Sequence, residues 1–219
     1  MVKMPCRFSN RGCENRSSGE SLLFHEKICE KSRVKCSKIV HACTESVELL
    51  TLVEHVQSRH RCPTTVGNSV LGVELWGPQD SEESCFWNYH HLQYNGNDFF
   101  TKIAYKESLV YFWVYMIGTD EETKDYGYRI SLGSSSDNTD ELSFKGKQVC
   151  SLFTSGSGLL EGNYGSSVLA MNRSTVKNLT KYNSNGRCVL EYKFEIIKKV
   201  CNLLVNRCKK TFLTKYVVV

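Results

Sequence analysis

The sequence has no long apolar stretch and no apolar segment at its N-terminus. A helix that spans a bilayer needs about 20 apolar residues, and no run in the 219 residues approaches that length. The opening segment MVKMPCRFSN carries no hydrophobic region of the kind found in a secretory leader. We therefore expect a soluble, cytoplasmic protein that makes no membrane contact, with the nucleus as an additional location.

Catalytic signatures are also absent from the sequence. It contains neither a glycine-rich phosphate-binding loop nor a Gly-x-Ser-x-Gly nucleophile turn. His90 and His91 are adjacent, so on a strand they would point to opposite faces and could not readily form one site. No set of residues in the sequence predicts catalysis, and we assign no catalytic residue.

Cysteine, in contrast, is abundant, with 11 in the chain. In a protein that is not secreted, cysteines stay reduced, which favours metal binding or free thiols over disulfides. Cys62, Cys85, Cys150 and Cys188 are scattered and are expected to be buried free thiols. The net charge of +5 is unevenly spread, since residues 198–219 hold six Lys/Arg and no Asp/Glu.

Five further cysteines form a duplicated pattern with three histidines. In the first unit, six residues separate two cysteines, eleven more precede a histidine, and three follow before the last cysteine. The second unit repeats these spacings at an offset of 30 residues, except that its last member is a histidine one residue later. The pattern predicts a Cys3His site made by Cys6, Cys13, His25 and Cys29, and a Cys2His2 site made by Cys36, Cys43, His55 and His60.

Both ligand sets have the composition of structural zinc sites. Zinc has no d-electron preference for a geometry, so four soft or borderline ligands in a tetrahedron are sufficient. Two small halves cannot bury an adequate core alone, and zinc binding, worth roughly 10–16 kcal/mol per site, would fold each half. We therefore expect two structural Zn²⁺ ions in closed sites that keep no open position for a catalytic water. The alternative, ordinary buried cysteines and histidines, leaves the matching spacing unexplained.

Basic residues on the first unit, Arg7, Arg11 and Arg16, raise the alternative of a nucleic-acid-binding finger. Fingers that read DNA usually pair their cysteines at two to four residues, and the cysteine loops here are longer. The second unit is acidic at Glu45, Glu48 and Glu54, in the region where a helix is expected. A solvated surface is the favoured interpretation, and nucleic acid is the disfavoured partner.

Beyond Pro63 the chain changes character. Short runs rich in aromatic or β-branched residues alternate with clusters of Gly, Asn, Ser and Asp, which is typical of an antiparallel sandwich. The runs cover residues 69–76, 84–94, 99–105, 109–117, 126–132, 149–153 and 188–197. Segments 121–125 and 174–181 are candidates for short helices. The predicted fold is mainly β, with two small zinc fingers followed by an antiparallel β-sandwich.

Three stretches resemble the seven-in-absentia (SINA/SIAH) family of ubiquitin ligases. The first is the paired finger, including the run His25-Glu26-x-x-Cys29. The second is FWVYMIGT at residues 112–119, similar to the family's strand that ends in Ile-Gly-Thr. The third is DYGYRISL at residues 125–132, similar to the Tyr-Arg-aliphatic strand that follows it.

The resemblance covers about residues 4–198 and implies a division of the chain into three parts. Residues 1–61 would form the paired SIAH-type zinc fingers, and residues 62–199 a TRAF-like β-sandwich that binds substrates. The basic tail, residues 200–219, is expected to be disordered. Phe144-Lys145 departs from the family, which tends to have Trp-Glu there.

The resemblance also implies a function and partners. A family member would bind degron-like peptides of substrate proteins for ubiquitin-dependent degradation, form homodimers, and reach a ubiquitin-conjugating enzyme through a full-length ligase. The RING that recruits this enzyme in the family has no counterpart in the sequence, because eight more metal ligands would be needed. Two interpretations remain open: a substrate-recruiting protein that itself lacks the RING, and a fragment or isoform of a complete RING-type E3 ubiquitin ligase.

The resemblance places a peptide site on the sandwich. In the family, an extended peptide adds as an extra strand beside the strand that follows the last finger, and the matching positions here are Thr64 and Val66. The family's second wall is a strand carrying a Trp, with contacts two residues apart. Cys85, Trp87 and Tyr89 have that spacing, and alternation along a strand would place them on one face. The alternative is that Trp87 belongs to the core.

Overall fold

The computed structural model describes most of the chain as far as Lys199, although the side chains of residues 73–75, 85–88 and 188 are not described. The described ranges are 2–40, 42–75, 85–106, 108–133, 142–153, 168–185 and 188–199. The basic tail, for which we expect disorder, lies outside these ranges. None of the helices within them has the length and apolar character that crossing a bilayer requires.

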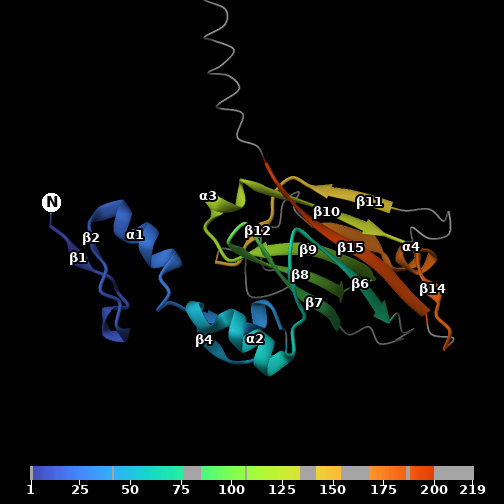
Figure 1. Cartoon of the computed structure of the whole chain (residues 1–219), viewed down its shortest axis with the longest axis horizontal. Helices are drawn as coiled ribbons and strands as arrows, with labels where there is room; N and C mark the ends of the chain where they lie inside the picture. Colours follow the sequence, from blue (N-terminus) through green and yellow to red (C-terminus); the bar gives the residue numbers. More distant parts are fainter. Residues whose placement is uncertain are drawn as a thin grey trace, which may run out of the picture.

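The region up to His60 forms two units, each a short hairpin followed by a helix (Figure 1). In the first unit, β1 (Met4–Pro5) pairs antiparallel with β2 (Arg16–Ser17), and α1 (Gly19–Ile28) follows. In the second, β3 (Arg33–Lys35) pairs antiparallel with β4 (Ser46–Glu48), and α2 (Leu52–His60) follows. Single 3-10 turns complete the units: η1 (Ser9–Arg11), η2 (Cys36–Lys38) and η3 (Leu49–Thr51). The repeat of the sequence is therefore also a repeat of the structure.

Two sheets follow and stack as a sandwich, so the predicted mainly β fold is confirmed. The first sheet has the order β11-β10-β15-β14, with β6 also paired to β15. It contains β6 (Ser69–Leu75), β10 (Tyr126–Leu132), β11 (Leu142–Gly146), β14 (Lys181–Tyr182) and β15 (Cys188–Lys198). The second sheet has the order β12-β9-β8-β7-β5, with β13 also paired to β9. It contains β5 (Thr64–Val66), β7 (Cys85–Tyr94), β8 (Asn97–Lys106), β9 (Leu109–Met116), β12 (Cys150–Ser151) and β13 (Leu169–Asn172).

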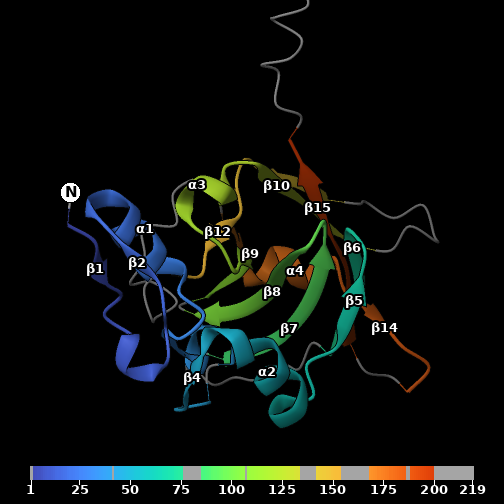
Figure 2. The same ribbon diagram turned by 60° about the vertical axis from the view of Figure 1, so that its left-hand side comes forward.

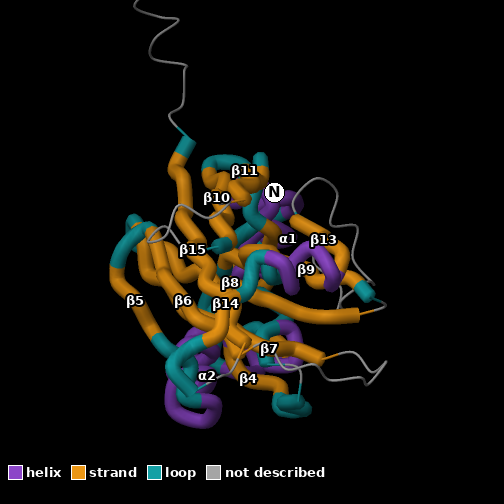
Figure 3. Tube along the Cα trace, turned by 90° about the vertical axis from the view of Figure 1, so that its right-hand side faces the viewer, coloured by secondary structure: helices purple, strands orange, loops and turns teal. Residues whose placement is uncertain are grey.

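The sandwich departs from a purely antiparallel arrangement at two places. The pairs β5–β7 and β12–β9 are parallel, while the other described pairs of the sandwich are antiparallel. Both helical candidates from the sequence are present in shortened form, as α3 (Asp120–Thr123) and α4 (Arg173–Asn178). Figure 3 shows β5 at the margin of the molecule, close to α2.

The main core lies between the two sheets. Phe112 and Val114 of β9 meet Tyr128 and Ile130 of β10 and Phe194 of β15 in one cluster, and all five side chains are fully buried. The clustered residues alternate along each strand, as they must when one face of a strand points to a core. The period-two pattern of the sequence thus fixes which side chains fill the sandwich.

The opposite face of the second sheet is buried as well, because the second finger covers it. Phe100 of β8 and Trp113 and Tyr115 of β9 share a cluster with Ile39 and Leu52 of the finger. Figures 1 and 2 show the second finger lying between the first finger and strands β7 to β9. A strand buried on both faces needs apolar residues at nearly every position, and β9 accordingly has the sequence LVYFWVYM.

Polar contacts cross the same boundary between finger and sheet. The Nζ of Lys102 on β8 donates to the carbonyl of Lys38 at 2.8 Å, and the Nζ of Lys38 donates to the carbonyl of Leu152 at 2.7 Å. The Tyr89 hydroxyl donates to the carbonyl of His60 at 3.3 Å. Lys102 is 5% exposed, and burial lowers the pKa of its amine to about 7. The second finger and the sandwich are therefore joined by one continuous interior.

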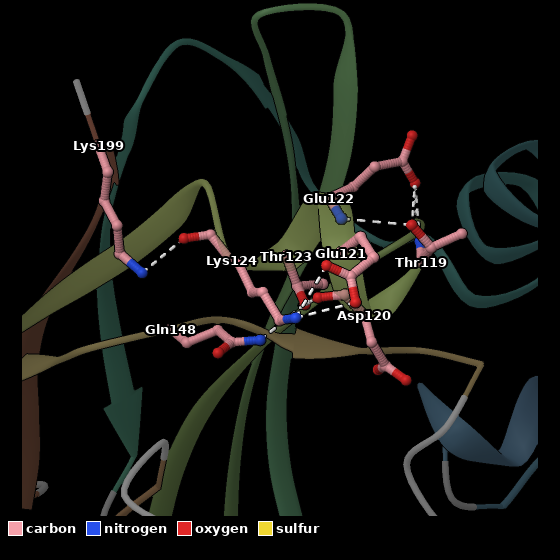
Figure 4. Close-up of polar contacts among 8 residues, drawn as sticks. All are labelled: Thr119, Asp120, Glu121, Glu122, Thr123, Lys124, Gln148 and Lys199. Atoms are coloured by element: carbon pink, nitrogen blue, oxygen red, sulfur yellow. Dashed lines mark hydrogen bonds and ion pairs between the residues drawn. The ribbon is translucent and has the colours of Figure 1, made fainter. Parts of the chain in front are cut away.

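A capping box fixes the turn between β9 and β10 (Figure 4). The Thr119 Oγ1 accepts from the Glu122 backbone N–H at 3.2 Å, and the Glu122 carboxylate accepts from the Thr119 N–H at 2.7 Å. Lys199, just past the end of β15, donates from Nζ to the carbonyl of Lys124 at 2.6 Å. The IGT stretch noted in the sequence thus leads directly into the N-terminus of α3.

Replacing Trp113 with alanine should destabilise the whole chain strongly. This side chain is 2% exposed and lies between the second finger and the sheet, and truncating a buried tryptophan costs about 3–5 kcal/mol. Chemical denaturation should show that loss, whereas Tyr182→Ala, at a residue that is 78% exposed, should change the free energy of unfolding by less than about 0.5 kcal/mol. Equal effects of the two substitutions would contradict the shared core.

Candidate zinc centres and peptide-binding edge

The first Cys/His cluster collects its members from both ends of the first finger. Cys6 follows β1, Cys13 follows η1, His25 lies on α1, and Cys29 is the residue at which α1 ends. The Sγ atoms of Cys6 and Cys29 are 3.9 Å apart, and the Sγ of Cys13 is 3.2 Å from the Nε2 of His25. All four ligand atoms lie within 4.8 Å of one another.

The second cluster repeats this arrangement in the second finger. Cys36 begins η2, Cys43 precedes β4, and His55 and His60 both lie on α2. The Sγ of Cys43 is 3.6 Å from the Nε2 of His55, which is 3.3 Å from the Nε2 of His60. Here too the four ligand atoms lie within 4.8 Å of one another. The structure thus brings together both sets of four residues that the spacing predicts.

The distances within each cluster match the edges of a zinc tetrahedron. With Zn–S near 2.3 Å and Zn–N near 2.05 Å, tetrahedral geometry puts two sulfurs about 3.8 Å apart, sulfur and nitrogen about 3.6 Å apart, and two nitrogens about 3.3 Å apart. The observed sulfur–sulfur distance of 3.9 Å, the sulfur–nitrogen distance of 3.6 Å in the second cluster and the nitrogen–nitrogen distance of 3.3 Å are close to these values. The sulfur–nitrogen distance in the first cluster, 3.2 Å, is shorter. The residues therefore fit a zinc ion in each finger, and four protein ligands close each site.

The thiol chemistry of the clusters also calls for a cation. Burial raises the pKa of Cys29 to about 11 and the pKa of Cys36 to about 12. Zinc binds the thiolate and supplies the charge that makes the thiolate stable inside the protein. Burial lowers the pKa of His60, which favours the neutral imidazole that a metal binds.

A carboxylate lies near one histidine ligand. The Nε2 of His55 faces the other ligands, and its Nδ1 lies 3.9 Å from a carboxylate oxygen of Glu45. That distance is too long for a hydrogen bond, so Glu45 acts on the ring through its charge alone.

The two fingers differ in whether their buried side chains pack against the sandwich. The first has a small cluster of its own, formed by Cys6, Leu22 and Cys29. The second contributes Cys36 and Cys43 to the cluster that also contains Trp113. Loss of the second zinc should therefore reach the sandwich, whereas loss of the first should not.

The edge strand β5 carries the first pair of residues expected to bind a peptide. The backbone N–H of His91 donates to the carbonyl of Pro63, and the N–H of Gly67 donates to the carbonyl of Gln93. In a strand, backbone groups alternate in direction, so the N–H and C=O of Thr64 and Val66 point away from β7. Among the described strands, β7 is the one that pairs with β5. Val66 is 80% exposed.

Thr64 is held by a polar network that the sequence did not indicate. Its Oγ1 accepts from the Nε2 of Gln57 on α2 at 2.7 Å and lies 3.2 Å from the Nδ1 of His91. The Nε2 of His91 is 2.9 Å from the Asp98 carboxylate. The contact between Thr64 and His91 arises because the two residues pair across parallel strands. They are 27 residues apart in the sequence, so no local pattern indicated the contact.

The second wall of the expected peptide site is only partly described. Tyr89 is half-buried and contacts the end of α2 through its hydroxyl. The side chains of Cys85 and Trp87 lie outside the described ones. A register shift between Phe86 and Asn88 interrupts the regular alternation from which we inferred a shared face. The participation of these three residues stays a prediction.

Comparison with known proteins agrees with the architecture. No protein-family model matches the chain. Over 140 residues, or 61% of this chain, it is 26% identical to E3 ubiquitin-protein ligase siah-1 of Caenorhabditis briggsae, of which 32% is covered. Over 137 residues, also 61% of this chain, it is 23% identical to E3 ubiquitin-protein ligase SINAT2 of Arabidopsis thaliana, of which 44% is covered.

The resemblance to the SINA/SIAH family is thereby confirmed. These low-identity homologues are SIAH and SINA ligases, and the two Cys/His clusters fit SIAH-type fingers that each bind one zinc ion. The chain spans between about a third and less than half of the length of these curated relatives.

Substitution of the matching histidines should separate the two zinc sites. His25→Ala and His55→Ala should each lower the zinc content from two ions per chain to one, measured by native mass spectrometry. His25→Ala should leave the thermal unfolding of the sandwich nearly unchanged, because the first cluster is independent of it. His55→Ala should lower the melting temperature markedly, because the second finger shares its core. Identical melting of the two variants, or fewer than two zinc ions in the unaltered protein, would contradict the assignment.

Proposed function

We propose that this chain recruits substrate proteins to ubiquitin ligation by binding degron-like peptides along β5. The outward direction of the Thr64 and Val66 backbone groups carries this proposal. An extended peptide can pair with those groups as a further strand, so that backbone hydrogen bonds provide affinity and side chains provide specificity. In this proposal the sandwich is of the TRAF-like type, and Cys85, Trp87 and Tyr89 form the second wall.

The zinc centres serve this function by holding the scaffold. Each site has four protein ligands and keeps no position for a substrate or an attacking water. The Gln57 amide on α2, donating to Thr64, links the second finger directly to the proposed peptide edge. Zinc binding therefore fixes the place and shape of the site while taking no part in a reaction.

We base the proposed partners on the homology to the two ligases named above. The chain acts as a homodimer in the cytoplasm and reaches a ubiquitin-conjugating enzyme through a complete SINA/SIAH-type ligase. Recruitment of a substrate and transfer of ubiquitin are then separate tasks. The second candidate is that these residues form part of a complete RING-type ligase. The homology supports a substrate-recruiting role for them equally well in that case.

Val66→Pro should weaken peptide binding without unfolding the chain. Proline lacks the N–H that Val66 directs away from β7, and an unmet hydrogen bond costs about 1–3 kcal/mol, or roughly 5- to 150-fold in affinity. The probe is a fluorescein-labelled 12-residue peptide selected on this chain from a random library, and the readout is fluorescence anisotropy. Thr64→Arg should abolish capture by blocking the same edge.

Val66→Ala is the matched control for the proline variant. It trims the same exposed side chain but keeps the backbone donor, so affinity should change less than about threefold. Trp87→Ala should weaken capture more than its melting shift explains. Unchanged binding by Val66→Pro and Thr64→Arg, or failure to select any peptide, would place recognition elsewhere.

The purified 219-residue chain should transfer no ubiquitin when it is assayed with a panel of conjugating enzymes. The reason is that the sequence shows no RING pattern of eight further metal ligands. The thiol–imidazole pairs Cys13–His25 and Cys43–His55 are assigned to the closed zinc sites, so they are not available as a nucleophile and a general base. Formation of ubiquitin chains would be followed by immunoblotting, with a RING-type ligase as the positive control. Robust chain formation by this protein would show a recruiting surface in the chain itself.

A further inference from the structure

A second binding feature lies between the two fingers, away from β5. A groove of about 720 Å³ is bounded by the first finger, by β3 and η2 of the second finger, and by the residues at the end of β12. Pockets of about 300–1,000 Å³ are the usual size of sites for small ligands and short peptide segments. Figure 2 shows the first finger and β5 on opposite sides of the second finger.

The rim of this groove is strongly basic. Six cationic side chains line it against a single carboxylate, that of Glu26. The six are Arg7, Arg11, Lys27, Arg33, Lys35 and Lys38. Three of them come from the first finger and three from β3 and η2 of the second, so the fold brings together basic residues that are separate in the sequence.

Few of these charges are neutralised within the described structure. Arg7 places its guanidinium 3.8 Å from the Glu26 carboxylate, which also accepts from the Arg7 backbone N–H at 2.8 Å. Arg33 and Lys38 donate to the backbone carbonyls of Ser46 and Leu152, which carry no net charge. One carboxylate therefore offsets one of six cations, and the groove retains a large positive excess.

The floor of the groove is apolar. Val34 and Leu152 are buried there, and Phe8 and Phe153 are half-buried. The guanidinium carbons of Arg7 and Arg11 lie 4.7 and 5.8 Å from the centre of the Phe8 ring. An apolar floor under a cationic rim suits a ligand that combines anionic groups with an apolar side chain.

We propose that this groove binds an acidic peptide segment of a partner protein, in which carboxylate or phosphoserine groups flank an apolar residue. The anionic groups meet the arginine and lysine side chains of the rim, and the apolar residue meets the half-buried Phe153. A nucleic acid fits less well, because arginines already lie over the Phe8 ring, and nucleobases need open aromatic faces for stacking. The groove thus gives the chain a second contact with partner proteins, independent of strand addition at β5.

The test uses the full chain loaded with zinc and four labelled ten-residue probes, read by fluorescence anisotropy. One peptide has glutamates around a central phenylalanine, and a second has phosphoserines in their place. A third has glutamines, and the fourth probe is a ten-nucleotide oligouridine. The first two should bind and the glutamine peptide should bind at least tenfold more weakly. Comparison of the two acidic peptides identifies which anion the rim prefers.

Matched charge reversals locate the binding. The double variant Arg11→Glu/Lys27→Glu should weaken binding of the acidic peptides at least tenfold, because both side chains line the groove. The control Arg16→Glu/Lys193→Glu makes the same change in net charge at exposed residues outside it and should change affinity less than threefold. Zinc content, measured for both, should stay at two ions per chain.

A third variant keeps the proposal open to refutation if a charge reversal disturbs folding. A fifth probe replaces the central phenylalanine of the glutamate peptide with glycine. The unaltered chain should bind the phenylalanine peptide more tightly than this probe, and Phe153→Gln should erase that preference. Val66→Pro should leave acidic-peptide binding unchanged, so this groove and the β5 edge can fail separately. Equal loss in both double variants, tighter binding of oligouridine than of the peptides, or no binding of either acidic peptide would overturn the proposal.

Discussion

Burial of the outer face of the second sheet beneath the second zinc finger is the constraint on which the remaining structure depends. Phe100, Trp113 and Tyr115 would otherwise present a large apolar surface to water, and such a surface is rare on a soluble protein. The finger that covers them can fold only once its ligands hold a metal, because so small a unit lacks an adequate core. Metal binding and the stability of the sandwich are therefore linked through shared side chains.

Local features of this fold could be predicted from the sequence, because they depend on spacing alone. The eight ligand positions follow from a repeat of 30 residues, and both clusters form as that repeat predicts. Runs rich in aromatic and β-branched residues, separated by turn-forming clusters, likewise predicted the strands β8, β9 and β10. The capping box at Thr119 is equally local, since its partner Glu122 is only three residues away, but we did not predict it.

Features that join distant parts of the chain could not be predicted in the same way. The contact of Lys102 with Lys38 spans 64 residues, and that of Thr64 with His91 spans 27. The parallel pairing of β5 and the register shift near Trp87 depend on how sheets close and bend, which alternation does not encode. The network that holds Thr64 was therefore invisible from sequence, although Thr64 itself was singled out through the resemblance.

The second finger is also the element that separates two surfaces of opposite physical character. On one side it supports β5, whose Thr64 and Val66 backbone groups point away from β7 and would offer an incoming strand directional hydrogen bonds that hardly depend on its charge. On its other side it forms part of a cationic groove, whose attraction for anions acts over a longer range and weakens with salt. A partner that has an acidic segment and an extended segment could engage both surfaces, and the rigid finger would fix the distance between them. Two weak contacts joined in this way give an affinity well above that of either one alone.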